Sequence, residues 1–399
     1  MRSCVNGTLK PIHPFPARMA SEIALKETSA LPKNSVVLDP MTGSGTAVRF
    51  ASEEGHRAIG FDRDPLAVLM TKVWTKPICT RWLRKAAERI ADKALKLDPA
   101  MVRLPWIDND QETTDFVSYW FAVEQRSDLR RLSSLLVNFR GPFGDAMLIA
   151  LSRIIITKKR GASLAWDVSH SRPHKKGEEN NFSVIPEFLK SVDFIAKRLE
   201  EQPPLGNVRV GVADARKLSS VADSTVDAVL TSPPYLNAID YLRGHKFTLV
   251  WLGHRICELR RIRSHSIGSE KKPDADSNGR LADQLCASLP LVSQLPPREL
   301  GIFRRYVLDL FAIMSEINRV LKPGGKAVLV IGNSCIKGRF VENDRVATVA
   351  ATRLGLSPIA CYERDLPSNR RYLPPPTMTE ASVLSKRMRT ESVLTFVKS

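Results

Sequence analysis

Short apolar runs that close on an acidic residue recur along the first part of the chain. Residues 34–39 and 57–62 are two such runs, each too short for a typical helix. Residues 47–51, between them, have the apolar spacing of a helix. Four further runs are predicted as strands: 207–214, 226–230, 326–331 and 392–397. Strands that alternate with helices in this way predict an α/β fold with a doubly wound, Rossmann-like sheet.

A long helix is predicted before the strand at 326–331. Tyr306, Leu310, Met314 and Ile317 recur at helical spacing, and the Pro-Gly-Gly run at 323–325 interrupts that pattern. Aromatic and methionine side chains at this spacing are typical of a helix face that packs on a core. We therefore interpret them as core positions and not as a cofactor site.

The second and third acid-terminated runs lie about 150 residues apart, far more than one crossover helix needs. The intervening patterns are mostly helical, with a basic amphipathic stretch at 83–97 and apolar faces at 129–137 and 147–156. We therefore predict a core domain formed by residues 1–75 and 206–399 and interrupted by a mostly helical region at 76–205. A polar insertion at about 260–300 is predicted to be mobile until a ligand arrives.

The charge of the chain adds a candidate partner to this fold. There are 60 Lys and Arg against 42 Asp and Glu, giving a net charge of +18, which favours binding to a polyanion and a steep dependence on salt. Solvent-facing loops often carry such charges without any ligand. We interpret the inserted region at 76–205 as a candidate region for nucleic-acid recognition. The predicted phosphate or base contacts fall on its loop at 169–176 and at the start of the polar insertion: Arg172, Lys175, Lys176, Arg260 and Arg261.

Cysteine usage and hydropathy indicate a reducing compartment. The six cysteines form no Cys-x-x-Cys pair and no ligand set with the seven histidines, so we expect no metal site. The sequence has no apolar run long enough for a membrane span, and its N-terminus lacks the apolar core of a signal peptide. We expect a cytoplasmic protein with free thiols.

The loop after the first run has the composition of a cofactor-binding turn. Asp39 and Pro40 precede Gly43, Gly45 and Thr46, and the helix that follows offers unpaired N–H groups at its start. The loop lacks the Lys-Ser/Thr ending of a P-loop, which argues against a nucleoside triphosphate. Asp62 ends the next run, where a Rossmann-like sheet places the carboxylate that holds a ribose. Together these features predict a cofactor that contains a nucleoside.

A second motif follows the run at 226–230. Ser232, Pro233, Pro234 and Tyr235 combine two prolines, which fix the backbone and remove two donors, with an aromatic ring. Carbonyls left unpaired beside the prolines could accept hydrogen bonds from an amino group, and Tyr235 could stack on a base. Taken alone, the motif could equally be an ordinary turn after a strand.

Taken together, the loop from Asp39 to Thr46, Asp62, and the motif from Ser232 to Tyr235 resemble the amino-group DNA methyltransferases. That family transfers a methyl group from S-adenosylmethionine to cytosine-N(4) or adenine-N(6). The resemblance implies that the glycine loop binds the methionine part of the cofactor, that Asp62 holds the ribose, and that the Pro-Pro-Tyr loop holds the target base. One departure is Met41, where the family usually has Phe after Asp-Pro.

Two further elements resemble parts of the same family. The segment at 12–18, which includes Phe15, resembles the segment that closes over the cofactor, and Asp214 with Ala215 resembles the element that contacts the adenine. On sequence alone, Asp214 could equally be a helix cap. The chemistry that the resemblance implies is a direct transfer to an amine, which depends on alignment more than on a strong base.

The base and the partners follow less directly from the motifs. Serine before the two prolines resembles the cytosine-N(4) subgroup, whereas Asp or Asn is commoner in the adenine-N(6) enzymes, so cytosine in duplex DNA is favoured. The alternatives are adenine-N(6) methylation, RNA methylation, which the lack of an appended RNA-binding module disfavours, and a DNA-binding protein without activity. No nuclease motif accompanies these elements, so any restriction endonuclease partner would be a separate protein.

Overall fold

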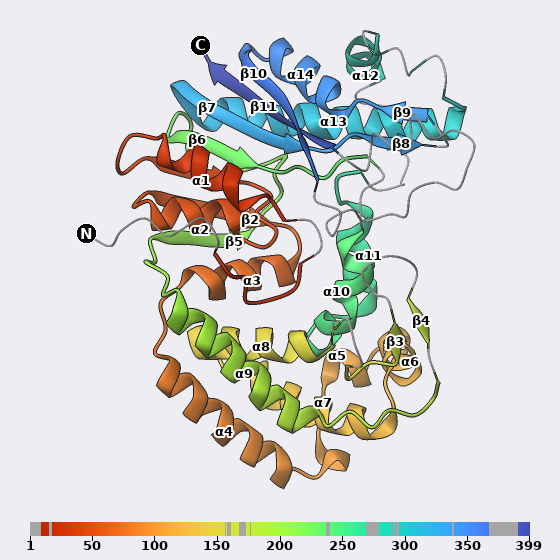
Figure 1. Ribbon diagram of the computed structural model, residues 1–399. Coiled ribbons are helices and arrows are strands. Elements are labelled where there is room, and N and C mark those ends of the chain that lie inside the picture. Colours follow the sequence, from red (N-terminus) through yellow and green to blue (C-terminus); the bar gives the residue numbers. More distant parts are fainter. Residues whose placement is uncertain are drawn as a thin grey trace.

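The computed structural model describes residues 9–15, 18–155, 157, 161–166, 173–175, 177–236, 240–268, 279–287, 289, 292, 295–336, 339–366 and 390–399. A seven-stranded sheet lies in the upper half of the view in Figure 1, with a helical region below it. Its strand order is β10-β11-β7-β6-β1-β2-β5. The strands are β1 (Val36–Asp39), β2 (Arg57–Asp62), β5 (Val208–Val212), β6 (Val226–Thr231), β7 (Leu321–Ile331), β10 (Leu356–Asp365) and β11 (Thr390–Lys398).

The sheet is parallel from β5 to β7, and β11 and β10 are antiparallel additions beyond β7. From β1 the chain first builds outward to β2 and β5, and it then returns to the other side of β1 with β6 and β7. The order therefore reverses between β1 and β6. In open α/β sheets ligands bind outside the carboxyl ends of the strands at such a reversal. The predicted doubly wound α/β fold is confirmed.

Two hydrophobic clusters cover the faces of the sheet. One is formed under the long α13 and under α14, and the other under α1, α2 and α3, from which it continues into the helical region. These five helices are α1 (Ser21–Ser29), α2 (Thr46–Glu53), α3 (Pro65–Thr75), α13 (Pro297–Val320) and α14 (Asn343–Arg353). Tyr306, Leu310, Met314 and Ile317 are all buried on α13, as their spacing predicts.

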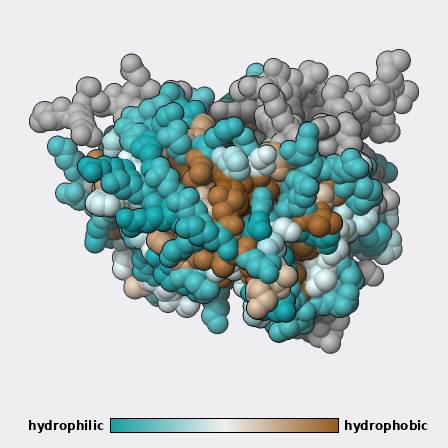
Figure 2. Space-filling model, turned by 90° about the horizontal axis from the view of Figure 1, so that it is seen from below, coloured by the Kyte–Doolittle hydropathy of each residue, from teal (hydrophilic) through white to brown (hydrophobic). Residues whose placement is uncertain are grey.

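The helical region contains six α-helices of the described chain and one 3-10 turn: α4 (Thr80–Lys96), η1 (Pro99–Met101), α5 (Pro105–Asp108), α6 (Gln111–Trp120), α7 (Val123–Leu136), α8 (Pro142–Ile155) and α9 (Val184–Glu201). Its small ribbon pairs β3 (Ala165–Trp166) with β4 (His174–Lys175). Seen from below in Figure 2, this side of the molecule is mostly hydrophilic, with hydrophobic residues showing in its middle. The amphipathic patterns of the sequence correspond to helices that bury one face, as α4 does with Leu83, Ala87 and Ile90.

Helix α10 (Tyr241–Leu249) runs from the sheet toward the helical region, where η2 (Val250–Leu252) follows it (Figure 1). Helix α11 (Ile256–Ser264) starts against α6 and returns toward the sheet. The polar range at about 260–300, expected to be mobile, includes the end of α11, all of α12 (Gly279–Cys286) and the start of α13. A second small ribbon joins β8 (Ser334–Ile336) and β9 (Arg339–Val341). None of the described helices is both long and apolar enough to cross a membrane.

Strand β10 forms one end of the sheet. Within the described residues it pairs only with β11, and residues 357–363 are all exposed. The pairing register shifts between Pro358 and Ala360, so the strand is bulged near its start. This strand could not be predicted from the sequence, because it lacks the apolar run that marks the buried strands.

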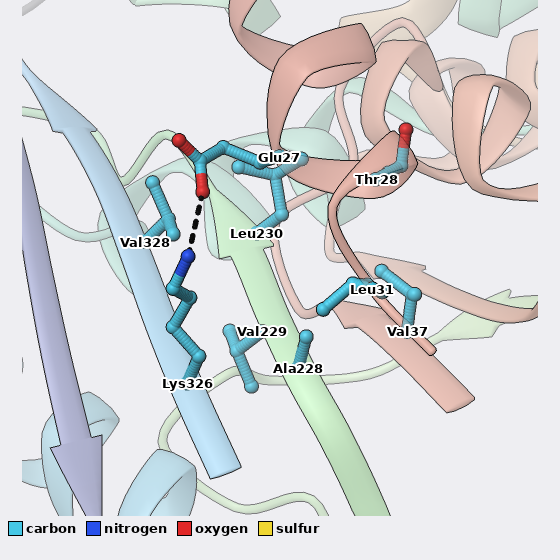
Figure 3. Close-up of a pocket in the computed structure, with 9 residues that line it drawn as sticks. All are labelled: Glu27, Thr28, Leu31, Val37, Ala228, Val229, Leu230, Lys326 and Val328. Atoms are coloured by element: carbon cyan, nitrogen blue, oxygen red, sulfur yellow. Dashed lines mark hydrogen bonds and ion pairs between the residues drawn. The ribbon is translucent and has the colours of Figure 1, made fainter. Parts of the chain in front are cut away.

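A small cavity lies where α1 packs on β1, β6 and β7 (Figure 3). Its walls are mostly aliphatic, and Lys326 Nζ lies 3.2 Å from a carboxylate oxygen of Glu27 beside it. Neither the glycine loop nor the Ser-Pro-Pro-Tyr motif contributes to its lining. We interpret the cavity as a packing feature that the ion pair between α1 and β7 closes.

Candidate functional site

The two sequence motifs meet at the reversal of strand order. β1 delivers Asp39 and β6 delivers Thr231 to the same edge of the sheet, where the Thr231 hydroxyl donates a 2.7 Å hydrogen bond to the Asp39 carboxylate. The backbone N–H of Met41 donates to the same oxygen at 3.1 Å. Asp39 is only 3% exposed, and burial raises its pKa to about 7. This contact fixes the start of the glycine loop against the start of the Ser-Pro-Pro-Tyr motif.

Asp62 lies at the end of β2 and faces the same loop. Its carboxylate accepts hydrogen bonds from the Gly43 N–H at 2.8 Å and from the Asp64 N–H at 2.9 Å. Burial, followed by the nearby charge of Asp64, raises the pKa of Asp62 to about 6. The backbone N–H of Arg63 also bonds to this carboxylate. A carboxylate has about four lone-pair positions, so these three bonds still leave acceptor capacity for a ligand hydroxyl.

The glycine loop turns tightly between β1 and α2. Gly43 and Gly45 both have positive φ, +50° and +88°, which glycine adopts at little steric cost. Gly45 is the N-cap of α2, and the adjacent hydroxyls of Ser44 and Thr46 lie 3.2 Å apart. Pro40 and Thr46 are buried beneath this turn.

The predicted closing segment does reach the glycine loop. The Phe15 ring lies so close to Gly43 that a β-carbon there would approach it to 3.2 Å. The same ring stacks on Tyr241 with centroids 4.9 Å apart. Tyr241 is the first residue of α10, and on the same helix His245 pairs with Asp64. Thus α10, which follows the Pro-Pro-Tyr loop, also contacts the N-cap of α3, two residues beyond β2. Pro16 and Ala17 of the closing segment lie outside the described residues.

The Ser-Pro-Pro-Tyr motif follows β6 and packs against the end of β7. The Ser232 hydroxyl donates a 2.8 Å hydrogen bond to the Val330 carbonyl. Pro233 is buried, whereas Pro234 and Tyr235 are half-buried. The Tyr235 ring lies against Gly332, where an added β-carbon would be 3.2 Å from it. The missing side chain of Gly332, just beyond β7, therefore makes room for the aromatic ring of the motif.

Asp214 lies beyond β5 and is held by two arginines. Arg63 approaches its carboxylate to 2.7 Å and Arg216 to 2.8 Å. Burial opposes ionisation, but the hydrogen bonds and charge of Arg216 outweigh it, so that the pKa of Asp214 is lowered. Arg63 and Arg216 also donate to the carbonyl of His265 at the end of α11. A ligand that used this carboxylate would have to share it with both guanidinium groups.

The described residues that were predicted to contact a polyanion lie on two elements, Lys175 on β4 and the adjacent Arg260 and Arg261 on α11. Lys175 lies on β4, 2.5 Å from Glu178 and over the ring of Tyr119. Arg260 pairs with Glu112, and Arg261, also on α11, is exposed. Arg172 and Lys176 lie outside the described residues. Lys175 and Arg260 thus have acidic neighbours that a polyanion would have to displace.

Several contributors to the candidate site were not predicted from the sequence. Thr231, Gly332 and His245 act through contacts across the fold, and only proximity to the motifs could have drawn attention to them. His245 is adjacent in sequence to the motif region, but its partner Asp64 is 181 residues away. Over the described residues, no cluster of three His, Cys, Asp or Glu side chains could hold a metal ion.

Comparisons with known proteins show that the chain is similar to methyltransferases. No family model matches the chain. The type II methyltransferase M.BsoBI of Geobacillus stearothermophilus is 24% identical, with 85% of this chain and 76% of that protein covered. The type II methyltransferase M.MvaI of Kocuria varians is 22% identical, covering 90% of this chain and 84% of that one.

A solved TehB-like SAM-dependent methyltransferase from Corynebacterium glutamicum is 11% identical, with a TM-score of 0.30, and covers 94% of this chain and 88% of that one.

Proposed function

We propose that this chain is an S-adenosylmethionine-dependent DNA methyltransferase that modifies the exocyclic N(4) amino group of cytosine in duplex DNA. Its similarity to type II methyltransferases over most of its length supports a DNA methyltransferase. The observation that carries the proposal is the contact between Asp39 and Thr231, because it joins a glycine loop suited to the cofactor with a loop suited to the amino group. The partner is duplex DNA, and any restriction endonuclease would be a separate protein.

The residues around the glycine loop fit S-adenosylmethionine. Asp62 has acceptor capacity for the ribose hydroxyls, and the tight turn at Gly43 and Gly45 allows close approach of the methionine part. Phe15 lies over this turn and would cover a bound cofactor. When bound, the cofactor supplies an electrophilic methyl group.

The motif residues would position the amino group for attack. Because the Ser232 hydroxyl hydrogen is directed to the Val330 carbonyl, its oxygen lone pairs remain able to accept an N–H of the base. The Pro233 carbonyl oxygen would be a second acceptor, in a backbone that the two prolines hold rigid. Two acceptors would favour a pyramidal, nucleophilic nitrogen and hold it in line with the methyl group. The proton released after transfer would leave through Ser232 or water.

The cytosine assignment rests on Ser232, and adenine-N(6) methylation is the alternative within the same mechanism. The test is to incubate the protein with labelled S-adenosylmethionine and duplexes of varied sequence, and then to digest the product to nucleosides. We expect N(4)-methylcytosine. N(6)-methyladenine would overturn the base, 5-methylcytosine would overturn the amino-transfer mechanism, and label only in RNA would overturn the DNA substrate. Cofactor binding without transfer to any duplex would favour a non-catalytic DNA-binding protein.

Ser232→Ala and Tyr235→Ala should fail in different ways. Loss of the Tyr235 ring removes a stacking surface worth about 1 to 3 kcal/mol, so the Michaelis constant for DNA should rise while cofactor affinity is retained. Ser232→Ala keeps the backbone and removes one acceptor, so its loss should appear chiefly in the methyl-transfer rate. Single-turnover assays on one duplex that the unchanged protein methylates separate the two effects. If both variants changed the same kinetic constant to the same extent, distinct roles for Ser232 and Tyr235 would be contradicted.

Cofactor affinity should depend on pH through Asp62. Its pKa is raised to about 6 in the free protein, and ribose hydroxyls would bind the ionised carboxylate better. Affinity should therefore rise between about pH 5 and 7, by at most about tenfold per pH unit, and level off above. Calorimetry in buffers of different ionisation enthalpy should show proton release near pH 6. Asp62→Asn should remove most of this release, and an unchanged release would assign it to another group, such as Asp39.

A further inference from the structure

A cluster of three basic residues lies directly beyond the Pro-Pro-Tyr loop. Arg243 and Lys246 are one helical turn apart on α10, and Arg263 reaches them from α11. Asp240, the N-cap of α10, is paired with both arginines: Arg243 Nε lies 3.6 Å from its carboxylate, and Arg263 Nε contacts the same oxygen. One carboxylate is thus shared by two guanidinium groups.

Lys246 makes the cluster more positive still. Its ammonium group lies over the ring of Phe116, 5.1 Å from the centroid, and 5.8 Å from that of Phe247. Burial, and then the neighbouring charge of Arg263, lower its pKa, with Asp240 acting in the opposite direction. Three cations around a single carboxylate leave a net charge of about two, and partial burial weakens the screening of that charge by water.

The cluster is also placed beside the candidate site. Tyr241, on the first turn of α10, stacks on Phe15 above the glycine loop, and Lys246 follows it on the same helix. The two arginine side chains remain accessible to a ligand, since Arg243 is 40% and Arg263 52% exposed, while Lys246 is half-buried. An anion bound here would lie near the loop that carries Ser232 and Tyr235.

We propose that Arg243, Lys246 and Arg263 form a binding site for a backbone phosphate of the DNA strand that carries the target base. This inference rests on the proposed function and adds a site to it. A base leaves the stack by rotation about its own backbone, so an enzyme that extrudes it gains from holding a neighbouring phosphate in place. The phosphate would offset the repulsion among the three cations, while Asp240 keeps both arginines oriented before DNA binds.

The test compares Arg243→Gln/Lys246→Gln with the unchanged protein. Binding to a substrate duplex is measured over a range of salt concentrations, and extrusion of the target base is followed with 2-aminopurine at the target position. We expect the slope of log K against log[salt] to become shallower by about one for the lost phosphate contact. The 2-aminopurine signal should fall, and S-adenosylmethionine affinity should not change.

Lys93→Gln on the exposed side of α4 is the matched control and should leave the slope unchanged. Arg263→Gln, at an exposed position, should also make the salt slope shallower and serves as the test if the double variant folds poorly. Lys246→Arg should keep the salt slope because it keeps the charge. An unchanged slope in Arg263→Gln and in a folded double variant would overturn the phosphate site while duplex methylation still stands. A change seen with RNA but not with duplex DNA would overturn it as well. Absence of duplex methylation by the unchanged protein would instead contradict the proposed function.

Discussion

Gly45→Ala should lower the free energy of unfolding by about 2 to 4 kcal/mol and abolish most cofactor binding. Gly45 has φ +88°, where an alanine costs roughly 1 kcal/mol or more. A β-carbon at this position would also lie 2.9 Å from the Thr71 hydroxyl and 3.2 Å from its α-carbon. Since the α-carbon belongs to α3, relief would require a shift of backbone, and such overpacking typically costs about 1 to 3 kcal/mol.

Gly55→Ala is the matched control for this prediction. Gly55 has nearly the same φ, +85°, but no atom lies within 4 Å of an added β-carbon. The Gly55→Ala variant should lose only about 1 kcal/mol of its free energy of unfolding and keep full cofactor affinity. Urea denaturation gives the first quantity and calorimetry the second. If the two variants were equally destabilised, the contact between the glycine loop and α3 would have no energetic importance.

Asp62→Ala should weaken S-adenosylmethionine binding by roughly ten- to a hundredfold. The change removes a charged acceptor, which is worth about 1.5 to 3 kcal/mol. It also releases the Gly43 N–H, which Asp62 holds at 2.8 Å, so part of the loss would come from a looser glycine loop. Calorimetry at pH 8, where the carboxylate is ionised, measures the effect.

Asp62→Asn separates the two contributions to this loss. The amide keeps an oxygen that can accept the Gly43 N–H but carries no charge, so its affinity should lie between those of the unchanged protein and Asp62→Ala. Melting temperatures of both variants show whether the fold is intact. Unchanged affinity in folded Asp62→Ala would remove this residue from the cofactor site.

The strands of the parallel core could be predicted from the sequence because each is an apolar run with a clear end. Residues 57–62 and 226–230 match β2 and β6 closely, since buried strands must be apolar on both faces. Strand β10 could not be predicted in this way because it is exposed and carries polar and charged residues. Strand β7 is longer than predicted: pairing begins at Leu321, because the Pro-Gly-Gly run is accommodated by a shift in register against β6.

The site shows a similar division. The sequence predicts that Asp39, Asp62 and Ser232 lie at one edge of the sheet, because Asp39 and Asp62 end strands and Ser232 directly follows one. Contacts between distant segments could not be predicted in this way. The arginines that hold Asp214, and Glu178 beside Lys175, are a matter of three-dimensional placement and charge pairing, for which no spacing rule exists.

The bulged strand β10 has a consequence for the behaviour of the protein in concentrated solution. An outermost strand offers unpaired backbone groups to which another chain could add, and such addition is a common route to aggregation. Here Pro358 has no N–H to offer, the bulge beside it disturbs a regular ladder, and Glu363 follows with a charge. This margin of the sheet should therefore resist edge-to-edge association even though the strand is exposed.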